Sequence, residues 1–442
     1  METREQRALH RHAAKADLAR VRRQLERNPS LAATVDPTDM RTALHRVARD
    51  TSMPTSRQAI AAMLLAAAPQ IVSAVDARGC TALHYAAAYG SVELVRQLMA
   101  AAPAAITLAD VRGNLPLHFA AARTGGAATV AALLAAAPWT AMATTTNWNL
   151  TPLFEAAGAD EESALLLLAA DPAAVTVRAA LSFRVGWTAL TQAARSGHAR
   201  LVAAILEVAP HAALIGDGNN DLPLHWASQH GFKPGHAVVR RLLIAAAPET
   251  CFMRDRDGDT PLMCAALQGN AGAIEQLLAA APAAMAIANN QGKLPILAAV
   301  HRYARQPDTQ TLESARHLLG AGDAAEVAAA LRRAADDWDT FEGPTAAVQQ
   351  LMVEFVALRA LTAEQWAMLP ADLPGLEAAL PTVLARSEAE AAILMARLPA
   401  EKRAFLRAAM LSLARLQRIT QLSIPAPALQ HIVSLAVQPD EH

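Results

Sequence analysis

A block of four residues recurs eight times along this chain, and no other feature constrains the fold as strongly. Its copies begin with Thr or Leu and carry Leu or Ile in third place; they are Thr42–His45, Thr81–His84, Leu115–His118, Thr151–Phe154, Thr188–Thr191, Leu222–His225, Thr260–Met263 and Leu294–Leu297. Successive copies lie roughly 34 to 39 residues apart. A fixed period of this length is typical of a solenoid, in which each helical unit stacks on the next.

A leucine-rich segment that ends on a proline follows each of the first seven blocks at a steady distance. The prolines are Pro69, Pro103, Pro138, Pro172, Pro210, Pro248 and Pro282. Because proline lacks an amide hydrogen and its ring clashes with the preceding turn, the second helix of each unit must end at or before it. The pattern therefore predicts units made of a short helix, a turn, a longer helix and an extended return loop.

The residue two places before each block is suited to a left-handed turn in seven of the eight copies, which are Gly79, Gly113, Asn149, Gly186, Asn220, Gly258 and Gly292. Glycine adopts positive φ freely, and asparagine is one of the few other residues that tolerate it. Met40 occupies the eighth position. It predicts either a distorted first hairpin or a first full repeat that begins only near Asp76.

Together, the two blocks and the turn residue resemble the ankyrin-repeat family, whose consensus is D-x-x-G-x-T-P-L-H-x-A-A followed by a helix with paired leucines. The resemblance covers about Asp36 to Gly320. It implies an all-α ankyrin-repeat solenoid of about eight helix-turn-helix units with short hairpin loops. It also implies a non-catalytic protein-protein interaction module or scaffold, which binds its partner on a concave surface lined by hairpin tips and first helices.

The sequence divides into three parts. Residues 1–35 are expected to form a helical N-terminal cap or a degenerate repeat, 36–320 the ankyrin repeat domain, and 321–442 a small helical C-terminal region, because the period disappears after Gly320. In the last part, helical spacing predicts apolar faces that pack on each other or on the last repeat, formed by Leu351, Phe355 and Leu358 and by Phe405, Leu406, Ala409 and Leu413.

Runs of alanine follow the recurring block in the same register of several units. They are Ala86–Ala88, Ala120–Ala122, Ala156–Ala157, Ala193–Ala194 and Ala265–Ala266. Because alanine combines high helix propensity with the smallest Cβ side chain, we expect these residues to be buried between neighbouring repeats.

Three units contain extra residues. Met53–Ser56 and Gly231–Gly235 lie between the two helices of their units, which predicts longer turns there. Leu181–Arg184 lies after Pro172 and predicts a longer return loop. Such insertions are tolerated in repeat proteins because they lie on loops at one face of the stack, often the binding face.

Two short segments of the C-terminal region suggest an alternative function. Leu398–Glu401 and Ile424–Pro427 look like fragments of the F-box or SOCS-box helices that tether ankyrin proteins to ubiquitin ligases, although neither motif is complete. The alternative is a substrate adapter that recruits a ubiquitin ligase through residues 321–442. Helices that begin with proline are the simpler interpretation of both segments.

Composition limits the partners and the compartment. The formal net charge is −1, so no global basic field attracts nucleic acid or an acidic membrane surface. No apolar run is long enough to cross a bilayer, and the three cysteines form no C-x-x-C pair. We therefore expect a monomer in the cytoplasm or nucleus that binds another protein, with no nucleic acid and no membrane insertion.

The candidate chemical sites favour structural roles. The recurring histidines, His45, His84, His118 and His225, fall one to a repeat, too far apart to share a zinc ion, so we expect their rings to bond the hairpin backbone. Asp255–Asp259 resembles a calcium loop only in its first residues. No phosphate-binding or nucleophile motif occurs in the chain. We therefore predict no enzyme activity, no catalytic residue, no cofactor and no metal.

The expected partner-binding residues lie at or near the hairpin tips. They are Arg78, Arg112, Trp148, Phe183, Trp187, Asp221, Asp259 and Lys293. Trp148, Phe183 and Trp187 stand out, because large aromatic side chains on exposed loops are over-represented among interface hot spots. The alternative is that these rings only cover the longer loop of the fifth repeat.

Overall fold

The computed structural model describes residues 4–50, 52–89, 91–182, 184–230, 234–339, 346–370, 373–404, 406 and 408. The chain forms two units. Unit 1 comprises Met1–Ala227 and Lys233–Ala247, and unit 2 comprises Ser228–Phe232 and Pro248–His442. Both consist almost entirely of helices, so the predicted all-α class is confirmed.

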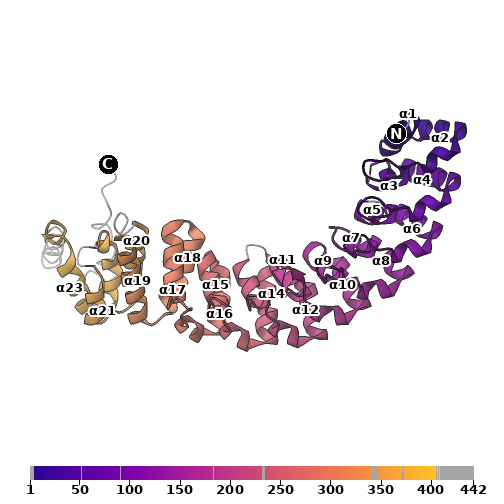
Figure 1. Ribbon diagram of the computed structural model, residues 1–442. Coiled ribbons are helices and arrows are strands. Elements are labelled where there is room, and N and C mark those ends of the chain that lie inside the picture. Colours follow the sequence, from indigo (N-terminus) through magenta and orange to yellow (C-terminus); the bar gives the residue numbers. More distant parts are fainter. Residues whose placement is uncertain are drawn as a thin grey trace, which may run out of the picture. The chain divides into compact units, whose positions relative to one another are not determined.

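Unit 1 is a two-layer stack of helix pairs, with the first helices on the inner side of its curve (Figure 1). The first helices are α1 (Arg4–Ala14), α3 (Ala43–Ala48), α5 (Ala82–Tyr89), α7 (Pro116–Ala121), α9 (Pro152–Ala159), α11 (Ala189–Ser196) and α13 (Pro223–Gln229). The second helices are α2 (Leu18–Arg27), α4 (Pro54–Ala67), α6 (Val92–Ala101), α8 (Ala127–Ala136), α10 (Glu161–Ala170), α12 (Ala199–Val208) and α14 (Pro234–Ala246). Each second helix contacts the next from α2 to α14, and each first helix contacts the next from α1 to α11.

Alanine allows this close stacking of the first helices. The first two alanines of every predicted run are fully buried, namely Ala86, Ala87, Ala120, Ala121, Ala156, Ala157, Ala193, Ala194, Ala265 and Ala266. The third members, Ala88 and Ala122, are not buried. The expected burial is therefore confirmed for each adjacent pair.

Each second helix from α2 to α16 (Ala271–Ala280) is followed by a 3₁₀ helix of five residues that begins with a proline. These helices are η1 (Pro29–Ala33), η2 (Pro69–Ser73), η3 (Pro103–Thr107), η4 (Pro138–Met142), η5 (Pro172–Thr176), η6 (Pro210–Leu214), η7 (Pro248–Phe252) and η8 (Pro282–Ala286). The prolines end the second helices as predicted. The return segment was expected to be extended, and this is wrong for its first five residues, which form the 3₁₀ helix. Proline's fixed φ and missing N–H also suit the first position of a new helical turn.

The first hairpin forms at Met40, so the first full repeat begins at Asp36 and not near Asp76. Met40 adopts a left-handed φ of 59°, close to the 75° of Gly79. The Asp36 amide donates to the Arg41 carbonyl at 2.8 Å, which makes this loop one residue longer than the one closed by the Asp76 amide and the Cys80 carbonyl at 2.9 Å. The longer loop still returns the chain to the first helix.

The extra residues that predicted longer turns lie mainly within the second helices, which are longer in these two repeats. Helices α4 and α14 have 14 and 13 residues, whereas α6 has 10. The extra residues from Pro54 onward add about one turn to the start of α4, and residues 231–233 lie outside the described part. Buried Arg57 fixes this added turn by donating to the carbonyls of Val47 and Ala14, both at 3.0 Å.

The insertion after Pro172 lies in the return segment, as predicted. It forms a small antiparallel hairpin of β1 (Ala180–Leu181) and β2 (Arg184–Val185), in which Leu181 pairs with Arg184. Phe183 lies outside the described residues.

Unit 2 begins with repeats of the same kind and continues with helices that lack the recurring block. Its helices are α15 (Pro261–Gln268), α16 (Ala271–Ala280), α17 (Pro295–Arg305), α18 (Thr309–Ala321), α19 (Ala324–Asp339), α20 (Ala346–Leu358), α21 (Ala363–Met368), η9 (Leu376–Ala379), α22 (Leu380–Arg386) and α23 (Glu388–Arg397). Helix α17 contacts α19 and α18 contacts α20, so the pairwise stacking extends beyond Gly320.

The apolar face predicted on α20 is only partly buried. Leu351 and Phe355 are fully buried, but Leu358 is 53% exposed, so its predicted packing is wrong. Leu406 is buried as expected, whereas Phe405, Ala409 and Leu413 lie outside the described residues.

Candidate functional site

The recurring histidines hold each hairpin on its helix and join it to the next hairpin. The Thr42 amide donates to His45 Nδ1 at 3.1 Å, and His45 Nε2 donates to the Cys80 carbonyl at 3.0 Å. The same pair of bonds recurs at His84, with Thr81 and Asn114, and at His118, with Leu115 and Leu150. The structural role predicted for these histidines is therefore confirmed.

This arrangement requires neutral imidazole rings. Burial lowers the pKa of His45 and His84, and it lowers the pKa of His118 to about 4. A protonated ring would turn Nδ1 into a donor that faces the amide it now accepts from. Because both nitrogens of these three rings bond the backbone, none is available as a metal ligand.

The hairpin tips of unit 1 are connected in a ladder of backbone hydrogen bonds. The Val111 amide donates to the Arg78 carbonyl and the Thr146 amide to the Arg112 carbonyl, both at 3.0 Å. The Ala180 amide donates to the Trp148 carbonyl at 2.8 Å. Arg78, Arg112 and Trp148 therefore occupy three successive tips in a fixed order.

These three predicted residues line one groove of about 470 Å³, which we call the tip groove. Its other wall comes from the first helices α5, α7 and α9 and includes Tyr85, Tyr89, His118, Phe119 and Glu155, while Asp110 lines the groove from a hairpin. The guanidinium carbon of Arg112 lies 5.1 Å from the centre of the Trp148 ring, a cation–π geometry that orients both groups. Arg78 and Arg112 are both exposed.

Aromatic side chains give the tip groove its apolar part. Phe119 meets the edge of the His84 ring with the ring centres 5.3 Å apart, and Tyr89 is 48% exposed. Tyr85 is buried, and its hydroxyl donates to Asp76 Oδ2 at 2.6 Å. The groove therefore combines exposed guanidinium groups with partly exposed rings.

A charged network anchors the N-terminal end of the groove. Arg41 donates from Nε to Asp76 Oδ2 at 3.2 Å and from an Nη to the Tyr85 hydroxyl at 2.6 Å. Burial alone would raise the pKa of Asp76, but hydrogen bonds from Tyr85 and from backbone amides hold it below its usual value. Burial and the Asp76 bond raise the pKa of Tyr85 to about 12.

Trp187 is buried, although the sequence analysis expected it on an exposed loop. It is only 4% exposed and belongs to a buried cluster with Leu150, Phe154, Ala179 and Leu181. Its ring centre lies 4.5 Å from that of Trp226. The alternative interpretation, that a ring covers the longer loop of the fifth repeat, is therefore correct for Trp187. Trp148 packs against the same cluster but remains partly exposed.

Asp221, Asp259 and Lys293 do not line the tip groove. Asp221 and Asp259 are buried, which corrects the expectation that their side chains are presented to a partner. Asn289 Nδ2 donates to Asp259 Oδ1 at 2.9 Å, and burial raises the pKa of Asp259. Lys293 is half-buried, and its role in binding stays a prediction.

The concave surface expected from the sequence includes the first helices, but none of their side chains that line the groove is among the predicted binding residues. Tyr85 and Phe119 each directly follow the histidine of the recurring block, and Glu155 occupies the same position in the next repeat. The mixture of residue types at one position of an otherwise regular block was the available signal.

Two family models match the chain. The model of ankyrin repeats in many copies matches residues 72–120, and the model of a single ankyrin repeat matches residues 257–290. The first match contains the hairpin of Arg78 and the start of α7, so it covers part of the tip groove. The chain therefore contains ankyrin repeats at two sites, one in each unit. No curated protein gives a significant match to it.

Ankyrin repeats generally mediate protein-protein interactions, and proteins built from them are typically non-catalytic interaction modules. Within the described part of this chain, no helix has the length and apolar character needed to cross a membrane. Its three cysteines, Cys80, Cys251 and Cys264, are buried free thiols, and burial raises the pKa of Cys80 to about 12. A thiol with such a pKa is unreactive at neutral pH.

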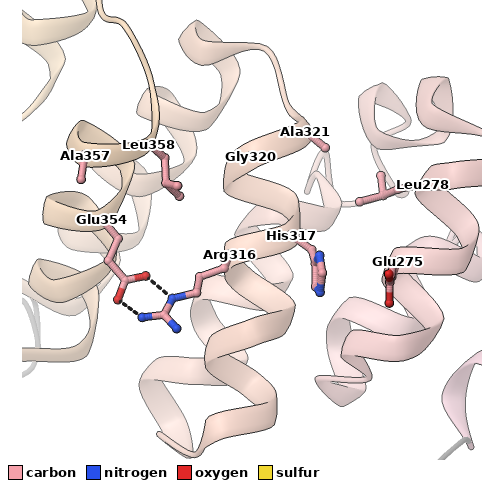
Figure 2. Close-up of a pocket in the computed structure, with 9 residues that line it drawn as sticks. All are labelled: Glu275, Leu278, Arg316, His317, Gly320, Ala321, Glu354, Ala357 and Leu358. Carbon is pink, nitrogen blue, oxygen red and sulfur yellow. Dashed lines mark hydrogen bonds and ion pairs between the residues drawn. The ribbon is translucent and has the colours of Figure 1, made fainter. Parts of the chain in front are cut away.

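A second groove, of about 660 Å³, lies on the second helices of unit 2. Figure 2 shows Arg316 of α18 joined to Glu354 of α20 by two parallel hydrogen bonds, both of 2.7 Å. His317 lies on the side of α18 that faces α16 and Glu275. Exposed Leu358 lines the groove. Because Arg316 and Glu354 neutralise each other, this groove offers a partner less charge than the tip groove does.

The segments behind the adapter alternative are only partly described. Helix α23 ends at Arg397, and Leu398 is buried where the chain leaves that helix. Residues 424–427 lie outside the described residues. Recruitment of a ubiquitin ligase therefore stays a prediction.

Proposed function

We propose that this chain is a non-catalytic protein-binding module or scaffold whose partner binds in the tip groove of unit 1. The observation that supports this most is the meeting of Arg112 and Trp148 with Phe119 on one face of two adjacent repeats. Tryptophan, tyrosine and arginine are the residue types most enriched among interface hot spots. None of the three side chains is needed to close a hairpin.

The proposal is tested by proximity labelling of the full chain in its native cells. Trp148→Ala removes the indole that faces the groove, and Arg112→Ala removes the guanidinium stacked on it. Trp139→Ala is the matched control, because Trp139 is 62% exposed and lies in η4, outside the tip groove. We expect both groove variants to lose the same partners and the control to keep them.

Other outcomes would contradict the proposal. Unchanged partners in both groove variants would exclude the tip groove as the binding surface. Loss in the Trp139→Ala variant alone would place binding on the 3₁₀ helices. Circular dichroism of each purified variant establishes that it is folded, which matters most for Trp148 because it also packs against the cluster around Trp187.

The remaining parts of the proposal are a monomeric state and a cytoplasmic or nuclear location. Buried free cysteines fit a reducing compartment, since oxidising compartments favour disulfides. Light scattering after size exclusion tests the monomer, and a fluorescent fusion tests the compartment.

A further inference from the structure

We infer that the tip groove binds an extended acidic peptide segment of the partner. This inference rests on the proposed function and adds the chemistry of the ligand: two carboxylates for Arg78 and Arg112, and an apolar side chain for the rings beside them.

Neither arginine of the tip groove is bound to a carboxylate in the described part of the chain. Arg78 and Arg112 lie on adjacent hairpins, which the bond between the Val111 amide and the Arg78 carbonyl holds together at 3.0 Å. Both side chains are exposed. Among the residues that the structure describes, neither guanidinium forms an ion pair with a carboxylate. Arg112 instead rests on the Trp148 ring, which leaves its N–H groups free to bond a ligand.

The carboxylates near the groove are already bound within the chain. Asp110 Oδ1 accepts from the amides of Arg112 and Asn114, both at 2.8 Å. Asp76 accepts from Arg41 and Tyr85. Glu155 also has an interaction within the chain. These carboxylates keep their charge, but Asp76 and Asp110 use their oxygens within the hairpins. The N–H groups of Arg78 and Arg112 are therefore the groups that an incoming acidic side chain can bond.

The spacing of the arginines sets the spacing of the acidic residues. Adjacent repeats are separated by roughly 8–10 Å, the usual distance between packed helices. An extended chain advances about 3.3 Å per residue. Acidic side chains two to four positions apart can therefore reach Arg78 and Arg112 together. An apolar side chain near them would meet Phe119 and the exposed part of Tyr89.

The test selects peptides from a random display library on the full-length protein. We expect the selected peptides to be enriched in Asp and Glu at this spacing and to bind more weakly as salt increases, because the arginines are exposed. Arg78→Ala/Arg112→Ala should weaken the strongest fluorescein-labelled peptide about tenfold. Arg78→Glu/Arg112→Glu should instead select peptides rich in Lys and Arg.

The matched control is Arg96→Glu/Arg241→Glu. It changes the net charge of the chain equally, but at exposed positions on the second helices α6 and α14. We expect this variant to select the same acidic peptides as the unchanged chain, because its tip groove is intact.

Three outcomes would overturn the inference, and they separate it from the proposed function. Selected peptides without acidic enrichment that are lost in Arg112→Ala would refute the acidic ligand and keep the groove. Acidic peptides selected equally by Arg78→Glu/Arg112→Glu would place their site elsewhere. Failure to select any peptide would refute an extended ligand, while the labelling of the Trp148→Ala and Trp139→Ala variants would still decide the proposed function.

Discussion

Two tryptophans on neighbouring hairpins, Trp148 and Trp187, have different surroundings. Trp187 lies under the β1–β2 hairpin, whose Ala179 amide donates to the Trp187 carbonyl at 2.8 Å. Trp148 lies at the edge of the same cluster, with Arg112 over its ring. The same residue type therefore serves the core at one tip and remains partly available at the next.

We expect Trp187→Ala to destabilise unit 1 by about 3–5 kcal/mol, because it removes a fully packed ring and leaves a cavity. Trp139→Ala should change stability by less than about 0.5 kcal/mol, since its ring is largely exposed. Urea unfolding followed by circular dichroism measures both. Equal shifts of the two midpoints would contradict the burial of Trp187.

His118 should make the protein less stable in acid. Its folded pKa of about 4 lies below 6.5, the ordinary pKa of histidine that applies to the unfolded chain. The unfolded state therefore binds more protons between these values, so the stabilisation is complete above the unfolded pKa and is lost as pH falls through the folded pKa. The loss for this one ring is about 3 kcal/mol.

Urea midpoints at several pH values, compared with those of a His118→Asn variant, measure this contribution. The variant should be less stable at neutral pH but should lose less stability between about pH 6.5 and pH 4. The same pH dependence in both proteins would mean that His118 is not the group responsible. The imidazole resonance in NMR spectra gives an independent value of the pKa.

At the scale of elements, the hairpin tips depend on left-handed turns stacked in contact. Gly79 has φ of 75°, and a Cβ added there would lie 2.9 Å from the Val111 amide nitrogen. Gly125 has φ of 72°, but nothing lies within 4 Å of its added Cβ. Alanine at either position strains the backbone, but only alanine at Gly79 also clashes with the adjacent hairpin tip. Comparing the two substitutions therefore separates the cost of strain from the cost of the clash.

We expect Gly125→Ala to cost about 1 kcal/mol, from left-handed strain alone, and Gly79→Ala to cost roughly twice as much. Gly79→Ala should also disturb the position of Arg112, because the clash falls on the hairpin that carries it. Urea unfolding measures the costs. Equal costs would show that the tips move apart freely and that the ladder between them is weak.

Most of the repeat elements could be predicted from the sequence, and part of the candidate site could. The period locates Arg78, Arg112 and Trp148 at successive tips, because each is counted from the same block. The period does not show which tip residue is buried by other side chains. Burial of Trp187 depends on the β1–β2 hairpin and on Trp226 from the next repeat, which no local pattern encodes.

At the scale of the whole molecule, unit 2 continues as a helical stack after its last recurring block. Tyr303 of α17 donates its hydroxyl to Gln350 of α20 at 2.9 Å. The Arg359 guanidinium bonds the carbonyls of Gly320 and Gly322 at the end of α18. The helices after Gly320 therefore cover the last repeat and bond its polar ends.

Removal of residues 321–442 should destabilise the rest of unit 2 and leave unit 1 unchanged. In repeat proteins each unit is stabilised by its neighbours, and the deletion exposes the apolar faces of α17 and α18. Hydrogen exchange followed by mass spectrometry should show faster exchange in residues 248–320 than in the intact chain, with no change in residues 4–227. Equal protection before and after deletion would show that the last repeat needs no cover.

The sequence by itself determined the unit, its period, the stop of each second helix and the structural role of the histidines. These features depend on backbone chemistry within one repeat or between adjacent repeats, which recurs every time the block does. Only the tertiary structure decided that Trp187 is buried, that Met40 completes a hairpin and that Phe119 joins Arg78 and Arg112 in one groove. Those outcomes depend on contacts between side chains that differ from repeat to repeat, so no periodic pattern carries them.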